Sequence, residues 1–113
     1  AGSTWSAPQA VPQLVDWGFA DEGSVTSDPA SGVLYFVHPD SHARANLSLW
    51  RSTDDGRSWD APVNVYPYSA AYSDSAVLDP KSAGGEGKRV GVLFEEDNNG
   101  DATAISFTTV EYE

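Results

Sequence analysis

Three groups of side chains in this sequence have the composition that chemical sites use. Asp54 and Asp55 are adjacent carboxylates, the kind of group that acid–base catalysis employs. His38 and His42 carry imidazoles, which titrate near neutral pH and bind metal ions. The segment 97–101, Asp-Asn-Asn-Gly-Asp, is rich in the oxygen ligands that calcium prefers. The elements around each group decide whether it forms a site or a turn.

The local sequence favours a turn or a loop in all three places. Asp54 and Asp55 directly precede a glycine, an order typical of tight turns. Two isolated histidines are too few ligands for a metal site, so we expect His38 and His42 to lie in loops. An EF-hand calcium loop needs glycine at its sixth position and glutamate at its twelfth, and segment 97–101 fits neither. We therefore expect a hairpin turn there, and neither a metal nor another cofactor.

The composition excludes several classes of function. The chain has 113 residues, enough for one small domain, with 17 acidic and 6 basic side chains and a net charge of −11. Such a surface repels phosphate backbones and anionic lipids, so we expect no nucleic-acid and no membrane partner. The absence of cysteine excludes disulfides and thiolate catalysis. The longest apolar run, Val33–Val37, is too short to span a bilayer.

The apolar residues occur in short runs that alternate with polar residues. No stretch has helical spacing, whereas Leu47 and Leu49 fall on one face of an extended segment and Ser48 and Trp50 on the other. Gly, Pro, Asn and Asp separate the runs. This pattern predicts an all-β fold with strands near residues 33–38, 46–52, 59–65, 73–78, 89–95 and 103–111.

The sequence contains an internal repeat. Gly-Ser-Thr-Trp-Ser-Ala-Pro at 2–8 recurs 54 residues later as Gly-Arg-Ser-Trp-Asp-Ala-Pro at 56–62. Propeller blades of four strands repeat at roughly 40–50 residues, so this spacing fits a slightly long blade. In the second copy we expect Asp54 to accept backbone N–H groups across a tight turn, Gly56 to take a positive φ, and Trp59 to pack under the hairpin.

The longer pattern Ser52-x-Asp54-x-Gly56-x-x-Trp59 resembles the Asp box, or bacterial neuraminidase repeat, of β-propellers. Three further segments resemble, in order and spacing, the C-terminal part of exo-α-sialidases of the lysosomal and bacterial types. The resemblance covers most of residues 13–110, and the three segments are 42–49, 70–74 and 90–95.

This resemblance implies that the chain is a C-terminal fragment, about two four-stranded blades, of a six-bladed β-propeller. Residues 1–20 would end one blade, residues 21–66 would form a full Asp-box blade, and residues 67–113 would form an incomplete last blade. The remaining blades, on this or on a separate chain, are then an expected partner. We expect activity only when they complete the propeller.

The resemblance also assigns roles to Arg44 and Tyr72. Arg44 matches the third arginine of a triad that binds the substrate carboxylate, and a guanidinium meets a carboxylate with two parallel charge-assisted bonds. Tyr72 matches the nucleophile. A neutral phenol approaches an anomeric carbon that carries a carboxylate without the repulsion that a second carboxylate would meet. Tyr66 and Tyr68, by contrast, are expected in a loop or at a pocket rim.

Glu95 matches the carboxylate that pairs with the first arginine of the triad. Glu96 follows it directly, and because a strand alternates its faces only one of the two can point inward. The family pattern places that residue after an aromatic, which selects Glu95 after Phe94. The acid/base aspartate, the other two arginines and the base for the tyrosine would lie upstream. Glu22 is compatible with a pocket wall and is not one of the expected site residues.

The function implied is that of a retaining exo-α-sialidase, which hydrolyses terminal sialic acids from sialylated glycans through a tyrosine nucleophile. A non-catalytic Asp-box propeller that binds a ligand is one alternative. A trans-sialidase, which shares these residues, is another. Such an enzyme is expected outside the cell or in the lysosome.

Overall fold

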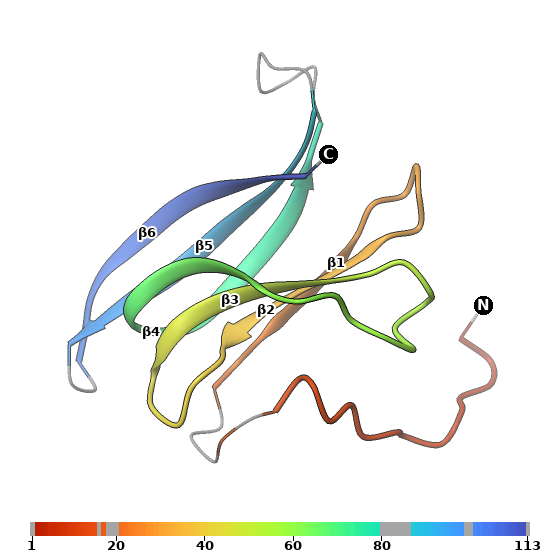
Figure 1. The fold of residues 1–113 in the computed structure, drawn as a ribbon, viewed down its shortest axis with the longest axis horizontal. Coiled ribbons are helices and arrows are strands. Elements are labelled where there is room, and N and C mark those ends of the chain that lie inside the picture. The colour runs from red at the N-terminus through yellow and green to blue at the C-terminus, as the bar shows by residue number, and fades with distance from the viewer. Residues whose placement is uncertain (1, 16, 18–20, 80–86, 99–100, 113) are drawn as a thin grey trace.

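The computed structural model describes residues 2–15, 17, 21–79, 87–98 and 101–112. In this part of the chain, six antiparallel strands form one sheet in which each strand pairs with the next (Figure 1). The all-β prediction is confirmed. No helix among these residues is long and apolar enough to cross a membrane. The strands are β1 (Ser24–Ser27), β2 (Leu34–Pro39), β3 (Ala45–Ser52), β4 (Val63–Leu78), β5 (Lys88–Asn98) and β6 (Asp101–Tyr112).

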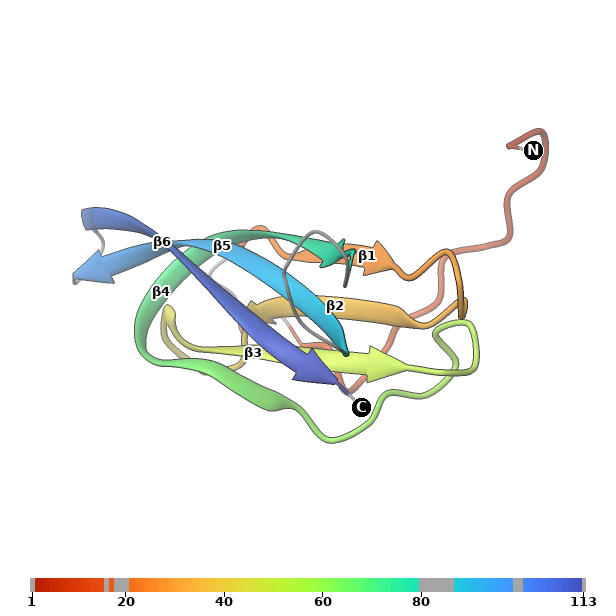
Figure 2. The ribbon, with the colours of Figure 1, turned by 90° about the horizontal axis from the view of Figure 1, so that it is seen from above.

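The longest strand, β4, exchanges its partner along its length. Residues 63–69 pair with β3, and residues 70–78 pair with β5. The strand curves between the two ladders, so the sheet rolls into half a barrel (Figures 1 and 2). The Ser24 hydroxyl of β1 donates a hydrogen bond to Asp74 Oδ1 at 3.0 Å and accepts one from the Ser75 N–H at 3.0 Å. These bonds attach the first strand to the second half of β4.

The prediction of separate strands at 59–65 and 73–78 is wrong, because residues 63–78 form one strand. Pro67 lacks an N–H group and would be expected to interrupt a ladder. It lies instead in the irregular stretch between Tyr66 and Ser69, where the β3–β4 register shifts. Tyr66 and Tyr68 therefore belong to a strand, and the Tyr66 ring packs on Phe94 with 5.1 Å between ring centroids.

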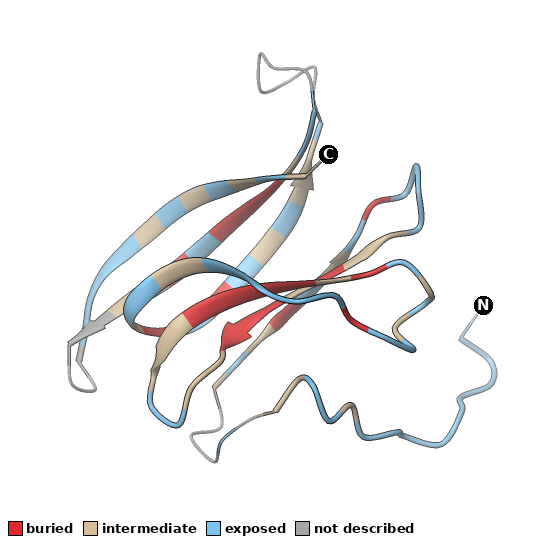
Figure 3. Ribbon diagram, in the orientation of Figure 1, coloured by how far each residue is buried: buried red, intermediate tan, exposed pale blue. Residues whose placement is uncertain are grey.

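The hydrophobic core fills the concave side of the rolled sheet. Alternate side chains of β2, β3 and β5 point into it, as period-two strands require, and the buried residues lie along these strands in Figure 3. Leu93 of β5 and Ile105 and Phe107 of β6 point to the opposite face and are exposed. The buried cluster consists of Tyr35, Val37, Leu47, Leu49, Ala70, Val90, Val92 and Phe94.

An ion pair joins the segment after β1 to the start of β5. Asp28, just after β1, is buried and lies 2.7 Å from the Lys88 ammonium at the start of β5. The same carboxylate accepts hydrogen bonds from the Ser31 hydroxyl at 2.5 Å and the Ala30 N–H at 3.0 Å. A buried carboxylate is stable only when it is paired and hydrogen-bonded, and these contacts meet that need.

The turn between β3 and β4 is organised by the Asp54 carboxylate. Its oxygens accept hydrogen bonds from the Ser58 N–H at 2.8 Å, the Ser58 hydroxyl at 2.6 Å and the Ser52 hydroxyl at 2.9 Å. Gly56 has a φ of 81°, a conformation that glycine adopts without steric cost. Trp59 closes the turn with only 9% of its surface exposed. The carboxylate thus holds a loop whose tryptophan fills space beneath the hairpin.

Replacing Trp59 with alanine should destabilise the fold far more than changing the exposed turn residue beside it. Losing a buried tryptophan costs about 3–5 kcal/mol, whereas a surface change is usually within about 0.5 kcal/mol. Asp55→Asn is the matched control, because asparagine tolerates the φ of 59° at this position. Urea unfolding of the full-length protein measures both. Equal midpoints for the two variants would show that Trp59 does not anchor the hairpin.

The stability of the fold should fall in acid through Asp28 and Asp54. Hydrogen bonds, chiefly from Lys88 to Asp28 and from Ser58 to Asp54, lower the pKa of each carboxyl from 3.8 to about 2. Because the folded-state pKa is depressed, this stabilisation is complete above about pH 4 and is lost as the pH falls toward 2. Urea midpoints measured between pH 5 and 2 should therefore decline. The decline should be shallower in Asp28→Asn and Asp54→Asn, and an unchanged slope would contradict the assignment.

Candidate active site

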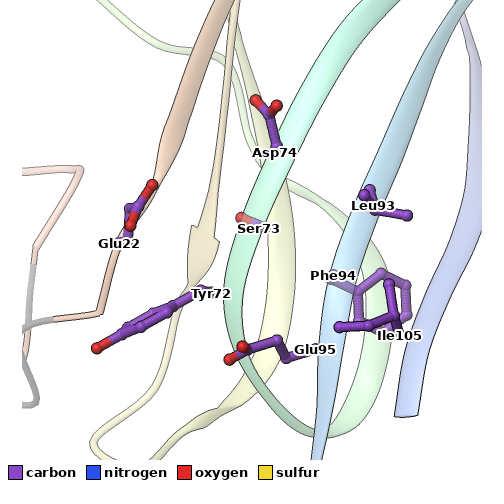
Figure 4. A pocket seen from close by; sticks show the side chains of 8 residues that line it. All are labelled: Glu22, Tyr72, Ser73, Asp74, Leu93, Phe94, Glu95 and Ile105. Carbon is purple, nitrogen blue, oxygen red and sulfur yellow. The ribbon is translucent and has the colours of Figure 1, made fainter.

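An open pocket lies on the outer face of the second half of β4, beside β5 and β6 (Figure 4). Two of the residues predicted for the site, Tyr72 and Glu95, line it together. Glu22, from the segment before β1, and Asp74 add two more carboxylates. The complete lining is Glu22, Tyr72, Ser73, Asp74, Leu93, Phe94, Glu95 and Ile105.

A β-bulge presents Tyr72 to this pocket. Ala70 pairs with Glu96 and Ser73 with Phe94, so the two residues between them on β4 lie opposite Glu95 alone. Bulges redirect side chains and are common beside active sites. Here the extra residue leaves Tyr72 on the outer face, 41% exposed, directly across the ladder from Glu95. Figure 4 shows the Glu95 carboxylate on the side of β5 where Tyr72 lies.

Glu95 and Glu96 point to opposite faces, as strand alternation requires. Glu95 lines the pocket, whereas Glu96 accepts a hydrogen bond from the Ser106 hydroxyl at 2.6 Å. Glu96 is therefore held by its neighbour on β6.

The third predicted residue, Arg44, contacts Tyr72 from the loop before β3. Its guanidinium carbon lies 5.3 Å from the centroid of the Tyr72 ring, within cation–π range. The backbone carbonyl of Arg44 accepts hydrogen bonds from the Ala70 N–H and the Ser69 hydroxyl, both at 3.0 Å. Arg44 is thus attached to β4 just before the bulge, although it is not among the residues that line the pocket.

Asn46 shapes the loop that carries Arg44. It has a φ of 60°, a left-handed conformation in which asparagine is enriched among non-glycine residues. Its amide donates to the Asp40 carbonyl at 2.9 Å, and its side-chain oxygen accepts a hydrogen bond from Asn64. The Asp40 N–H donates back to the Asn46 carbonyl at 3.1 Å. These hydrogen bonds close the base of the loop and so restrict the positions that Arg44 can adopt.

Asp21 is the residue of this region that the sequence did not indicate. Its Oδ1 lies 3.0 Å from Arg44 Nε, and its side chain is only 8% exposed. The two residues are 23 positions apart in different loops, and no motif joins them. Glu22, considered only as a pocket wall, does line the pocket, and Asp74 is held there by Ser24.

The histidines have different surroundings from those predicted. His38 is not in a loop but in β2, where it is buried. Its ring centroid lies 5.0 Å from that of Phe36. His42 does lie in a loop, and its ring packs against Trp17 with 3.9 Å between the ring centroids. No group of three or more His, Asp or Glu side chains that could hold a metal ion occurs in the part of the chain that the structure describes. Residues 99 and 100 of the predicted 97–101 turn lie outside that part.

Comparison with known proteins relates the chain to sialidases. The chain is 31% identical, over 93 residues, to the sialidases of a classical and an El Tor strain of Vibrio cholerae serotype O1. This chain is distantly related to sialidases. The match covers 73% of the chain but only 12% of each sialidase. No protein-family model matches the sequence. A sialidase-like relationship therefore rests on a short part of much longer relatives.

Proposed function

We propose that this chain is the C-terminal part of a retaining exo-α-sialidase and that Tyr72 is its nucleophile. The observation that carries the proposal is the contact of Arg44 with Tyr72, at a bulge facing Glu95, in a chain with sialidase-like sequence. A cation that can bind a carboxylate therefore lies beside a phenol that can attack the carbon next to it. Sialic acid carries its carboxylate on the anomeric carbon, so both groups would act on neighbouring atoms.

In this mechanism Arg44 binds and orients the substrate. Its guanidinium would make parallel charge-assisted bonds to the carboxylate and so bring the anomeric carbon to the Tyr72 oxygen. The phenol oxygen attacks that carbon while its proton passes to a base, and an acid protonates the departing glycosidic oxygen. Water then hydrolyses the sialyl–tyrosine intermediate. Two displacements at the same carbon retain its configuration.

The remaining groups would come from the rest of the protein. The acid, the base and two further arginines belong to the upstream blades in this proposal. Glu95 would pair with one of those arginines, hold it toward the substrate carboxylate and offset its charge. The substrate would be a sialylated glycan, and the enzyme would work outside the cell or in the lysosome.

The proposal includes a six-bladed propeller with an Asp-box turn at Ser52–Trp59. Residues 1–20, 21–66 and 67–113 would be the end of one blade, a full blade and an incomplete last blade. The exchange of partners on β4 at residues 69 and 70 supports a division near that point. The exposed side chain of Phe107, which does not line the pocket, supports a neighbouring blade, on this or a separate chain, that covers this part of β6.

A non-catalytic propeller that binds sialic acid is the second candidate. Arg44 can bind a carboxylate whether or not a reaction follows, and its contact with Tyr72 would suit a binding site equally well. A trans-sialidase would use the same residues and differ in the acceptor. Turnover therefore separates the first candidate from the second.

Tyr72→Phe should abolish turnover and spare binding. The variant keeps the ring that Arg44 contacts and removes only the attacking oxygen, so kcat on a fluorogenic sialoside should fall by about 10³-fold or more. The affinity for sialic acid should change no more than a few-fold. Tyr68→Phe, an exposed tyrosine of the same strand, is the matched control. A kcat near the wild-type value in full-length Tyr72→Phe would remove Tyr72 from the mechanism.

A further inference from the structure

The Asp21–Arg44 ion pair joins a buried acid to the residue that the proposed function uses to bind substrate. Asp21 Oδ1 lies 3.0 Å from Arg44 Nε, and the Arg44 side chain is 31% exposed while that of Asp21 is 8% exposed. A carboxylate this deeply buried needs a cation beside it. Arg44 therefore has a fixed partner on one side, and the Tyr72 ring lies against its guanidinium carbon.

The segment that carries Asp21 has little room to move. Gly23 packs so closely on β2 that a Cβ added there would lie 2.7 Å from Phe36 Cζ and 3.0 Å from the Val37 carbonyl oxygen. Ser24 then hydrogen-bonds Asp74 on β4. Asp21 is consequently held from the side of β1 and β2, whereas the Arg44 backbone is held from β4.

We propose that Asp21 is a positioning residue that orients the Arg44 guanidinium for a carboxylate ligand. The inference rests on the proposed function, because it concerns the same binding arginine. A guanidinium is planar and rigid, so an ion pair at Nε also sets the direction of the edge formed by Nη1 and Nη2. Asp21 does not touch the substrate in this account. It selects one orientation of a long side chain that could otherwise adopt several.

Electrostatics alone predicts the opposite effect. Asp21 is a negative charge near the place where an anion would bind, so removing it should strengthen carboxylate binding if charge were its main contribution. Orientation predicts weaker binding when it is removed. The sign of the change therefore distinguishes the two roles.

The test measures how strongly the full-length protein prefers a carboxylate. N-acetylneuraminic acid and its methyl ester are titrated by ligand-observed NMR, and the ratio of the two affinities gives the preference. Asp21→Asn, which keeps the shape of the side chain, should reduce this preference about tenfold, and Asp21→Ala at least as much. Asp60→Ala is the matched control, because it breaks another Arg–Asp ion pair that lies away from the pocket. In that pair Asp60 Oδ2 lies 2.6 Å from Arg51 Nη2.

Arg44→Ala and the double variant Asp21→Asn/Arg44→Ala complete the design. If Asp21 acts through Arg44, removing Asp21 should have no further effect once Arg44 is gone. The double variant and Arg44→Ala should then show the same preference for the acid over the ester. A further tenfold loss in the double variant would show that Asp21 acts independently, and an increased preference in Asp21→Asn would show that it only offsets charge. Either result overturns the inference. If Arg44→Ala keeps the full wild-type preference, the proposed binding role of Arg44 fails instead, whatever Asp21 does.

Discussion

The exchange of hydrogen-bonding partners along β4 sets both the curvature of the sheet and the position of the candidate site. At residues 69 and 70 the strand leaves β3 and joins β5, and the sheet must curve there. The Arg44 carbonyl binds to both residues at this point, and the bulge that presents Tyr72 follows directly. One curved strand thus forms the core on its concave side and the pocket on the other. A change that straightened β4 would both separate Arg44 from Tyr72 and expose the core.

Charge pairing is the second determinant, since acidic residues greatly outnumber basic ones. Within the described residues, four cations each contact a carboxylate, and two of these pairs involve buried acids. Asp28 with Lys88 links the segment after β1 to β5, and Asp21 with Arg44 fixes the loop beside the pocket. Pairs with a buried member matter more than exposed pairs, because breaking one leaves an uncompensated charge in a poorly solvated place. The surface acids keep the remaining net charge negative.

Local features were predictable from the sequence, and features that depend on distant contacts were not. The turn around Asp54 and the opposite faces of Glu95 and Glu96 follow from rules that act over a few residues. The continuity of β4 through Pro67 and the burial of His38 do not, because both depend on neighbouring strands. The Asp21–Arg44 pair crosses two loops and has no sequence signal. The roles of Arg44, Tyr72 and Glu95 come from a resemblance and stay predictions, although the fold brings Tyr72 together with each of the other two.

The proposed mechanism requires a bond between the Tyr72 oxygen and the substrate, and this bond can be trapped. A sialosyl fluoride with a second fluorine beside the anomeric carbon combines a good leaving group with a destabilised transition state for release, so the intermediate should accumulate. After incubation with the full-length protein, peptide mass mapping locates the adduct. We expect a sialyl group on Tyr72 and none in Tyr72→Phe. An adduct on any other residue, or hydrolysis of sialosides by a protein in which Tyr72 is never labelled, would contradict it.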